Sequence, residues 1–424
     1  MLNNPFPFLT IRGRKLLPIV QGGMGVGVSA HRLAGAVARE NGVGTIASVD
    51  LHHHHADLVE RVRGHRDEAT LNRVNLDALD REIKAAQQTA DGQGMVAVNV
   101  MKAVAEHPQY VRQACESGAN AIVMGAGLPL DLPEMTADFP DVSLIPILSD
   151  SRGISVVLKK WLRKNRLPDA IVIEHPGHAG GHLGAPRIDD VHHPRFEFKT
   201  VLQETLELFK QLAIEAEKIP LIVAGGINSH EKVKSLLGMG ASAVQLGTAF
   251  AVTEEGDAHP NFKKVLAEAA ADKIVTFMSV AGLPARGVLT PWLANYLKRE
   301  EKLQSCAKAD PARCAARLNC LSMCGLRDGI NKFGQFCIDS QLAAALRGEV
   351  SKGLFFRGSE PVPFGDAVRS VRELMNICSM VYCRMVWFKP ECNRVSRKRP
   401  EGRFFYAEPR WRGPVSTVGR PSGV

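Results

Sequence analysis

The chain has 424 residues, of which 45% are hydrophobic and 23% are charged. This composition excludes a collagen-like or intrinsically disordered chain, and no apolar run approaches the ~18–20 residues of a membrane-spanning helix. Because a plain α/β barrel needs only roughly 250 residues, we expect one large domain and a smaller second unit. The absence of a recognisable secretory signal and the nine cysteines lead us to expect a cytoplasmic protein with reduced thiols.

The net charge of +9 is concentrated near the C-terminus. Residues 381–424 hold 10 Lys and Arg but only 3 Asp and Glu, so the rest of the chain is nearly neutral. A basic tail is weaker evidence for nucleic-acid binding than a basic face on a folded domain, and we do not expect nucleic acid as a main partner. Residues 376–424 also lose helical periodicity and become rich in Arg, Pro and Gly, which predicts a disordered tail.

Eight short runs of aliphatic and β-branched residues recur along the chain, and helix-like stretches lie between them. The runs are 17–21, 44–47, 95–99, 121–124, 144–149, 170–174, 221–224 and 243–246. The predicted helices between them include 30–41, 155–165, 199–216 and 229–238. Continuous apolar strands that alternate with helices indicate a parallel sheet covered on both faces, and eight such units predict a closed (β/α)8 TIM barrel, an α/β fold.

Two segments exceed what a minimal barrel needs. Residues 51–93, after the second strand, are long and polar and predict an insertion of one or two helices. Residues 253–375, after the eighth strand, are rich in helix-like segments where a barrel needs one helix. We therefore predict a barrel over residues 1–252, a mostly helical lid domain over 253–375 that returns to the barrel, and the tail over 376–424.

Glycines follow several of the predicted strands at the end of the barrel where the chemistry of this fold is found. Gly225 and Gly226 follow the seventh strand, and Gly247 and Thr248 follow the eighth. Glycines allow backbone N–H groups to approach a phosphate closely, and the start of the next helix adds the positive end of its dipole. The pattern predicts a phosphate site at these two strand ends.

The first and third strands end in residues suited to a flat ring. Gly22 and Gly23 would let a ring lie against the first strand end, and Asn99 offers an amide to ring heteroatoms. A planar cofactor with one phosphate fits FMN. Residues 25–30 also resemble the GxGxxA fingerprint of a dinucleotide-binding sheet, with Asp50 near the place of the ribose-binding acid. That alternative leaves the glycines of the last two strands unexplained.

The loop after the sixth strand carries His175, His178 and His182 between glycines. A His with a pKa near neutrality can accept a substrate proton or stabilise a developing anion. His178 and His182 could instead bind zinc, but Gly180 and Gly181 disfavour the helix that would align them, and no third ligand follows. We predict no metal site.

Two further clusters carry residue types that bind metals. Residues 52–55 are four consecutive His, which we interpret as a surface loop. Five cysteines lie at positions 306, 314, 320, 324 and 337. Because their spacing lacks the Cys-x2-Cys pairs of iron–sulfur and zinc sites, we expect buried or capping thiols.

Several of these stretches resemble the nitronate monooxygenase family, formerly called 2-nitropropane dioxygenases, and the related flavin-dependent enoyl-ACP reductases. The resemblance spans about residues 5–375 and rests on PIVQGGMGVG, VNVM, MGAG, AGGHLG, IVAGGI, AVQLGTAF and AHPNFKK. It implies an FMN-binding barrel with a smaller lid domain. It also implies a flavin that takes electrons from the substrate or from NAD(P)H.

The resemblance implies roles for individual residues. Those in contact with the ring and ribityl chain would be Gln21, Gly22, Gly23, Met24, Asn99, Glu174 and Gly181. Those around the phosphate would be Gly225, Gly226, Gly247 and Thr248. His182, the His of AGGH, would be the catalytic His, and His178 and Arg286 are candidates for contact with the substrate.

The expected activity is FMN-dependent oxidation of alkyl nitronates with O2 to a carbonyl compound and nitrite. An alternative keeps the same site but uses NAD(P)H to reduce an enoyl thioester or a quinone. A third hypothesis is a non-catalytic protein whose basic tail recruits nucleic acid or acidic partners. The expected partners are a small-molecule substrate and O2, and the sequence leaves open whether the chain forms a homodimer.

Overall fold

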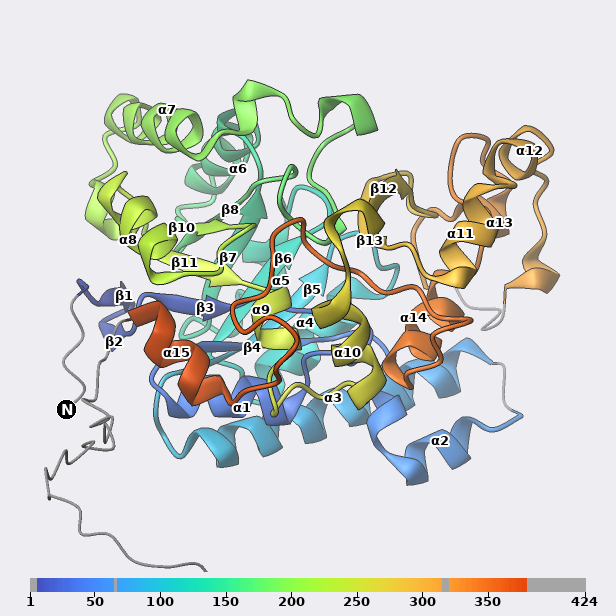
Figure 1. The fold of residues 1–424 in the computed structure, drawn as a ribbon. Coiled ribbons are helices and arrows are strands. Elements are labelled where there is room, and N and C mark those ends of the chain that lie inside the picture. Colours follow the sequence, from blue (N-terminus) through green and yellow to red (C-terminus); the bar gives the residue numbers. More distant parts are fainter. Residues whose placement is uncertain (1–5, 65–66, 315–319, 380–424) are drawn as a thin grey trace, which may run out of the picture. The chain divides into compact units, whose positions relative to one another are not determined.

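The computed structural model describes residues 6–64, 67–314 and 320–379. At its centre lies a closed barrel of eight strands (Figure 1). They are β3 (Ile19–Gln21), β4 (Val43–Ala47), β5 (Met95–Met101), β6 (Ala121–Gly125), β7 (Ser143–Leu148), β8 (Ile171–Glu174), β10 (Leu221–Ala224) and β11 (Ala243–Leu246). The strands pair in parallel, and β11 closes the barrel against β3. The predicted TIM barrel is confirmed.

The strands of the barrel are covered on both faces, which is why most of their positions are apolar. In β10, Ile222 and Ala224 pack into the barrel interior, while Leu221 and Val223 pack outward under the helices. Alternate side chains of a strand point to opposite faces of the sheet, so a strand covered on both faces has few polar positions.

Helices surround the barrel. They include α1 (His31–Arg39), α4 (His107–Glu116), α5 (Leu132–Met135), α6 (Ser151–Leu162), α7 (Phe198–Gln211) and α8 (His230–Gly238). On α1, Leu33, Val37 and Ala38 are completely buried, so one stripe of the helix faces the core. The helix also approaches its neighbour closely, because a Cβ atom at Gly35 would lie 2.6 Å from the Cβ atom of Thr89.

The insertion after β4 contains η1 (Leu51–His54), α2 (Ala56–Val62) and α3 (Glu68–Ala90). The His run lies at its start and is half-buried, so its interpretation as a surface loop was wrong. His52 Nδ1 lies 2.7 Å from Asn75 Oδ1, and His54 Nε2 lies 2.8 Å from the carbonyl oxygen of Gly27. The partners that bury these side chains come from α3 and from the loop after β3.

The post-barrel segment (residues 253–379) combines helices and strands. Its elements are α10 (Pro260–Glu268), β12 (Ile274–Met278), β13 (Pro284–Val288), α11 (Pro291–Leu297), α12 (Glu300–Ser305), α13 (Gly325–Asp328), α14 (Ile338–Leu346) and α15 (Val371–Ser379). Strands β12 and β13 form an antiparallel three-stranded sheet with β9 (Gly181–His182), which the sequence analysis did not predict. The segment returns to the barrel where His230 Nδ1 of α8 lies 3.1 Å from the carbonyl oxygen of Cys378.

The predicted tail starts inside α15, and from residue 380 onward it lies outside the described residues. Of the five clustered cysteines, Cys324 caps α13, since its Sγ accepts a hydrogen bond from Arg327 N at 3.5 Å. Among the described residues, no group of three or more His, Cys, Asp and Glu is arranged to hold a metal ion. Within the same ranges, we find no helix whose length and apolar character would let it cross a membrane.

Candidate active site

A cavity of about 290 Å³ lies at the carboxyl ends of the barrel strands. Its size is close to the lower limit of ~300–1,000 Å³ that is usual for small-molecule sites. The predicted site residues that line it are Gly22, Gly23, Met24, Asn99, Glu174, His178, Gly181, His182, Gly225, Gly226, Gly247 and Thr248. Of the remaining two predicted residues, neither Gln21 nor Arg286 lines the cavity.

Gly22 and Gly23 form a flat wall because side chains from neighbouring strands lie directly behind them. A Cβ atom at position 23 would stand 2.4 Å from the Cβ atom of Asn99. A Cβ atom at position 22 would stand 3.2 Å from Nε2 of Gln245. Only glycine fits at position 23 without displacing Asn99, so the first strand end can present bare backbone to a ligand.

The glycines after β10 and β11 form a second wall. Gly225 and Gly226 have φ values of +114° and +68°, which L side chains rarely adopt. A Cβ atom on Gly226 would also lie 2.9 Å from the Cβ atom of His178. At Gly247, which precedes α9 (Thr248–Ala251), a Cβ atom would point into open space beside Met24 Sδ, 3.9 Å away. The two strand ends leave backbone accessible from the cavity, as a phosphate site requires.

Gln21 has a different place from the one predicted. Its side chain is completely buried, and its Oε1 accepts a hydrogen bond from Thr45 N at 2.8 Å. Its Nε2 donates to Thr45 O at 3.0 Å. The amide therefore joins β3 to β4, and the side chain does not line the cavity.

Burial shifts the pKa values of two predicted site residues in the cavity, Glu174 and His182. Burial raises the pKa of Glu174 to about 7 and lowers the pKa of His182 to about 4. The Nε2 atom of His182 is buried and has no hydrogen-bond partner among the described residues. Buried polar atoms are almost always hydrogen-bonded, so this nitrogen points to a ligand group that completes the site.

Arg286 holds the loop that carries the three His. Its buried guanidinium donates hydrogen bonds to the carbonyl oxygens of Pro176 at 2.9 Å and Ala179 at 2.5 Å. In the sheet, Arg286 is paired with Gly181 of β9, and the residue before it, Ala285, is paired with His182. Arg286 therefore positions the His loop from behind, whereas the sequence placed it in contact with an anionic substrate.

The other two His of the loop have partners of their own. His178 Nδ1 lies 3.2 Å from Ser359 Oγ and 3.4 Å from Glu360 Oε1, and Glu360 Oε2 accepts a hydrogen bond from Lys232 Nζ at 3.2 Å. Burial lowers the pKa of His178, although Glu360 opposes the shift. The buried His175 does not line the cavity, and its Nδ1 accepts a hydrogen bond from Gly177 N at 3.0 Å.

Residues of the post-barrel segment complete the cavity, and the sequence analysis did not find them. Phe356 lies beside the catalytic candidate, with its ring centroid 5.7 Å from that of His182. Asp339 and Leu342 of α14 and Cys320 also line the cavity. No local motif marks these positions, because their role comes from pairing and packing across hundreds of residues.

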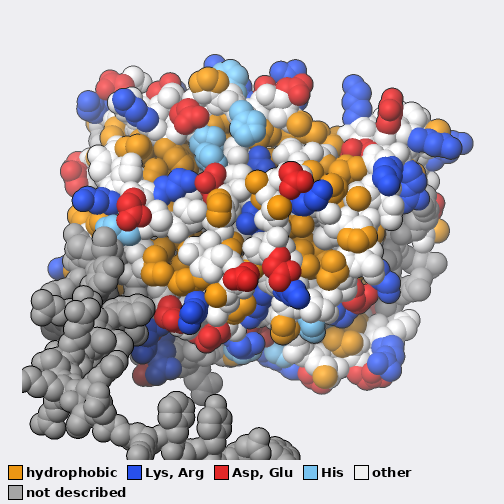
Figure 2. Space-filling view, viewed as in Figure 1, with side chains coloured by type: hydrophobic (Ala, Val, Ile, Leu, Met, Phe, Trp, Pro, Cys, Tyr) orange, Lys and Arg blue, Asp and Glu red, His pale blue; other side chains and the backbone are white. Residues whose placement is uncertain are grey.

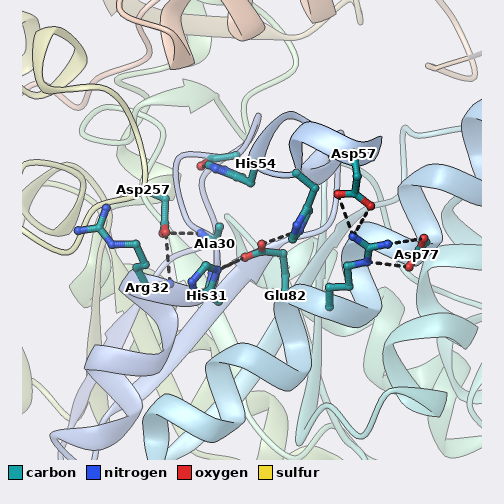
Figure 3. A network of polar contacts seen from close by, with 11 residues as sticks. Ala30, His31, Arg32, His54, Asp57, Asp77, Glu82 and Asp257 are labelled. Carbon is teal, nitrogen blue, oxygen red and sulfur yellow. Dashed lines mark hydrogen bonds and ion pairs between the residues drawn. The ribbon is translucent and has the colours of Figure 1, made fainter. Parts of the chain in front are cut away.

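A network of polar contacts holds the start of α1 (Figure 3). The completely buried Glu82 of α3 accepts a hydrogen bond from His31 N at 2.7 Å, and its Oε1 lies 2.9 Å from His55 Nε2. The hydrogen bond to Glu82 raises the pKa of His31. Burial alone would raise the pKa of Glu82, but His31 lowers it. Asp257 accepts a hydrogen bond from Ala30 N at 2.8 Å, so two acids fix the end of the glycine-rich loop.

The described surface carries no extended charged field on the face in Figure 2, where acidic and basic side chains are interspersed. The described residues on that face form no basic patch to which the phosphate backbone of a nucleic acid could bind.

Comparison with known proteins identifies the family to which the chain belongs. A family model described as nitronate monooxygenase matches residues 12–354. A probable nitronate monooxygenase of Bacillus subtilis (strain 168) is 28% identical over 289 residues, which are 65% of this chain and 77% of that protein. FabK from Thermotoga maritima has a TM-score of 0.59 at 20% identity and covers 86% of this chain and 92% of its own. A nitroalkane oxidase from Streptomyces ansochromogenes has a TM-score of 0.58 at 18% identity, covering 89% and 95%. At these identities the two structures show a shared fold.

Proposed function

Because the chain belongs to the nitronate monooxygenase family and is an oxidoreductase, we propose that it binds FMN and oxidises alkyl nitronates with O2 to a carbonyl compound and nitrite. One observation carries the proposal: His182, whose buried Nε2 has no hydrogen-bond partner in the described part of the chain, lines the same cavity as the glycine-rich strand ends.

The cavity walls fit FMN. The bare backbone of Gly23 beside Asn99 suits a flat ring, and the backbone of Gly226 and Gly247, both of which line the cavity, suits a phosphate. The ring and the phosphate of one molecule would then lie on walls formed by β3, β5, β10 and β11. Bound FMN would supply the redox chemistry, accepting electrons from the substrate and passing them to O2.

His182 would bind the substrate through its neutral imidazole. With a pKa of about 4, the ring carries no charge at neutral pH and can donate or accept one hydrogen bond at Nε2. A nitronate oxygen in the cavity would satisfy this atom. The pKa of Glu174, about 7, keeps part of that carboxyl protonated near neutrality, which weakens its repulsion of an anionic substrate.

The post-barrel segment would exclude water from this reaction. Leu354, Phe356 and Val362 line the cavity opposite the barrel strands, and Leu354 is completely buried. Exclusion of water from the cavity strengthens each hydrogen bond to the substrate and protects reactive species from hydrolysis.

The test is anaerobic mixing of the purified holoenzyme with ethyl nitronate or with NADPH, followed by flavin absorbance. We expect ethyl nitronate to bleach the flavin and NADPH to leave it oxidised. A His182→Ala variant that retains flavin should bleach at least ~100-fold more slowly. The exposed His192, which follows in the same loop, gives a matched control, His192→Ala, that should bleach at the native rate.

Two results would overturn the proposal. A protein that neither carries nor takes up flavin would contradict both the cofactor and the reaction. Rapid bleaching by NADPH with ethyl nitronate inert would assign the cavity to the alternative reaction, an NAD(P)H-dependent reduction of an enoyl thioester or a quinone.

A further inference from the structure

A single strongly basic side chain lines the cavity. Of the described residues in its wall, Arg357 alone is a Lys or an Arg. The residue is only 3% exposed. Its Nε donates a hydrogen bond to the carbonyl oxygen of Leu266 at 2.8 Å, and its Nη1 donates to that of Gly358 at 3.0 Å. Both acceptors are uncharged backbone groups, so these bonds leave the charge of the guanidinium unbalanced.

No acid of the described chain balances this charge. Among the ion pairs of the described residues none includes Arg357, and burial is the one cause that shifts its pKa, downward. The acid of the same loop, Glu360, is instead balanced by Lys232 Nζ, 3.2 Å away. An Arg guanidinium remains charged at neutral pH. A buried cation is costly unless an anion reaches it, so Arg357 points to a negatively charged ligand in the cavity.

The loop that carries this guanidinium, residues 357–361, is fixed to the carboxyl ends of β10 and β11, and we call it the strap. Gly358 N donates a hydrogen bond to Thr248 Oγ1 at 3.0 Å, which joins the strap to the end of β11. Asn228 Nδ2, in the loop after β10, donates to the carbonyl oxygen of Pro361 at 2.9 Å. The strap is therefore held at the same two strand ends that carry the glycines proposed to bind phosphate.

The side chain of Arg357 lies on the side of the cavity next to α9 and α10. Its partner Leu266 belongs to α10 and packs in one hydrophobic cluster with Ala251 of α9, the helix that follows β11. The residue before it in the chain, Phe356, packs instead against His182. The two neighbouring side chains thus serve different parts of the cavity, and the guanidinium is at the phosphate end.

A phosphate is the anion that these groups fit. Thr248 and Arg357 line the same cavity as Gly226 and Gly247. The Thr248 hydroxyl accepts the bond from Gly358 N, and no described residue accepts its own hydrogen, which is left for a ligand. Within the described ranges, Nη2 of Arg357 has no acceptor either. A guanidinium can donate parallel N–H···O bonds to a phosphate, and such charge-assisted bonds are about twice as strong as bonds between neutral groups.

We propose that Arg357 is the counter-ion of the cofactor phosphate, and that it makes the enzyme select FMN over riboflavin, the same flavin without the phosphate. The proposal rests on the proposed function for the presence of a flavin. It also gives the strap a role, since the strap carries a charged contact from the post-barrel segment to a cofactor whose other contacts lie on the barrel.

The test compares the dissociation constants of FMN and riboflavin, measured from flavin fluorescence as the loaded full-length protein is diluted. Arg357→Gln removes the charge but can still donate to the Leu266 carbonyl. It should bind FMN at least ~10-fold more weakly than the native protein does and riboflavin equally well. Arg357→Lys keeps the charge and should retain most of the preference for FMN. Arg347→Gln, whose side chain is 52% exposed, is the matched control and should behave as the native protein.

The outcomes separate this proposal from the proposed function. If Arg357→Gln loses the preference for FMN while ethyl nitronate leaves the native flavin oxidised, Arg357 binds the phosphate and the proposed reaction fails. If the variant binds both flavins as the native protein does, or binds both equally weakly, the role of Arg357 is overturned even where nitronate is oxidised. Native flavin affinities with a raised KM for ethyl nitronate would assign Arg357 to the substrate. A loss of preference in Arg357→Lys as large as in Arg357→Gln would also contradict the proposal.

Discussion

Gly23 and Asn99 lie in direct contact across β3 and β5, so that a Cβ atom at position 23 would stand 2.4 Å from the Cβ atom of Asn99. This contact fixes the distance between two walls of the cavity. Alanine at position 23 must therefore displace the Asn99 side chain into the space proposed for the flavin ring.

We expect Gly23→Ala to fold but to bind FMN at least ~10-fold more weakly, because loss of one well-placed contact surface costs about 1.4 kcal/mol or more. The measurement is the ratio of FMN to protein after purification and after titration with FMN. Gly238→Ala is the matched control, since a Cβ atom there meets nothing within 4 Å. A Gly23→Ala protein with native FMN affinity would show that the ring lies elsewhere.

His182 should titrate far below an ordinary His. Burial lowers its pKa to about 4 from the model-peptide value of 6.5, because the cavity disfavours the charged ring. Protein labelled at His Cε1 should show a resonance that stays in its neutral position down to about pH 5 and that is missing in His182→Gln. A second such resonance, from His53, whose pKa burial also lowers to about 4, should remain in the variant. A midpoint at or above 6.5 for the His182 resonance would contradict the environment described for it.

The sign of this shift also predicts a stability trend. Between pH 6.5 and about 4 the unfolded chain binds a proton at this His that the folded chain does not. The contribution of His182 to folding is therefore fully present above pH 6.5 and is lost as the pH falls toward 4. His182→Gln should flatten the acid side of the stability profile measured by urea unfolding.

Removing the guanidinium of Arg286 should lower kcat more than it raises KM. Arg286→Leu leaves the carbonyl oxygens of Pro176 and Ala179 without donors and frees the loop that carries His182. We expect at least a ~10-fold loss of kcat and about 1–3 kcal/mol of stability per buried carbonyl left unpaired. Arg286→Lys should recover part of kcat, because a Lys can still donate to one carbonyl.

The control for this prediction is Arg187→Leu, at a side chain that is 77% exposed. If Arg286→Leu instead raised KM alone for an anionic substrate, Arg286 would contact that substrate. That result would restore the role that the sequence suggested.

Glu82→Gln should destabilise the fold most strongly near pH 6. His31, whose pKa is raised by Glu82, contributes stability below pH 6.5 that is lost as the pH rises through its folded pKa. Glu82, whose pKa is lowered, contributes stability that is lost as the pH falls through its own folded pKa. The pair is therefore strongest in the mildly acidic range between them.

We expect Glu82→Gln to cost about 3–5 kcal/mol of unfolding free energy near pH 6 and less above pH ~8, as measured by urea unfolding. Glu60→Gln is the matched control, because the Glu60 side chain is 65% exposed in its ion pair with Arg63. Equal effects of the two substitutions would mean that the network in Figure 3 adds nothing to stability.

The barrel could be predicted from the sequence because its signals are local. The strand Leu221–Ala224 is continuous apolar sequence that a pair of glycines ends, and the observed bounds equal the predicted ones. The same glycines, with Gly23, mark the cavity walls, since each is required by backbone conformation or by a close neighbour. Composition and spacing carry such information directly.

The features that the sequence did not reveal depend on distant partners. Strand β9 has two residues, too few for a periodic signal, and exists because it pairs with β13. Asp339 lines the cavity from α14, in the post-barrel segment, and lies in no motif. The family resemblance placed Gln21 in contact with the cofactor, but its amide is bonded to the backbone of Thr45 in the neighbouring strand, a partner that no local pattern reveals.

Because β9 pairs with β13, the strand ends proposed for cofactor binding and the residue proposed for the reaction come from two different sheets. The walls proposed to hold the cofactor belong to the barrel, whereas His182 belongs to a sheet whose other two strands lie in the post-barrel segment. Residues 274–288 do not contain His182 but supply the strands against which it is held. Their replacement by the matching segment of a relative would therefore move His182 against the cofactor walls while leaving that His and the barrel sequence unchanged.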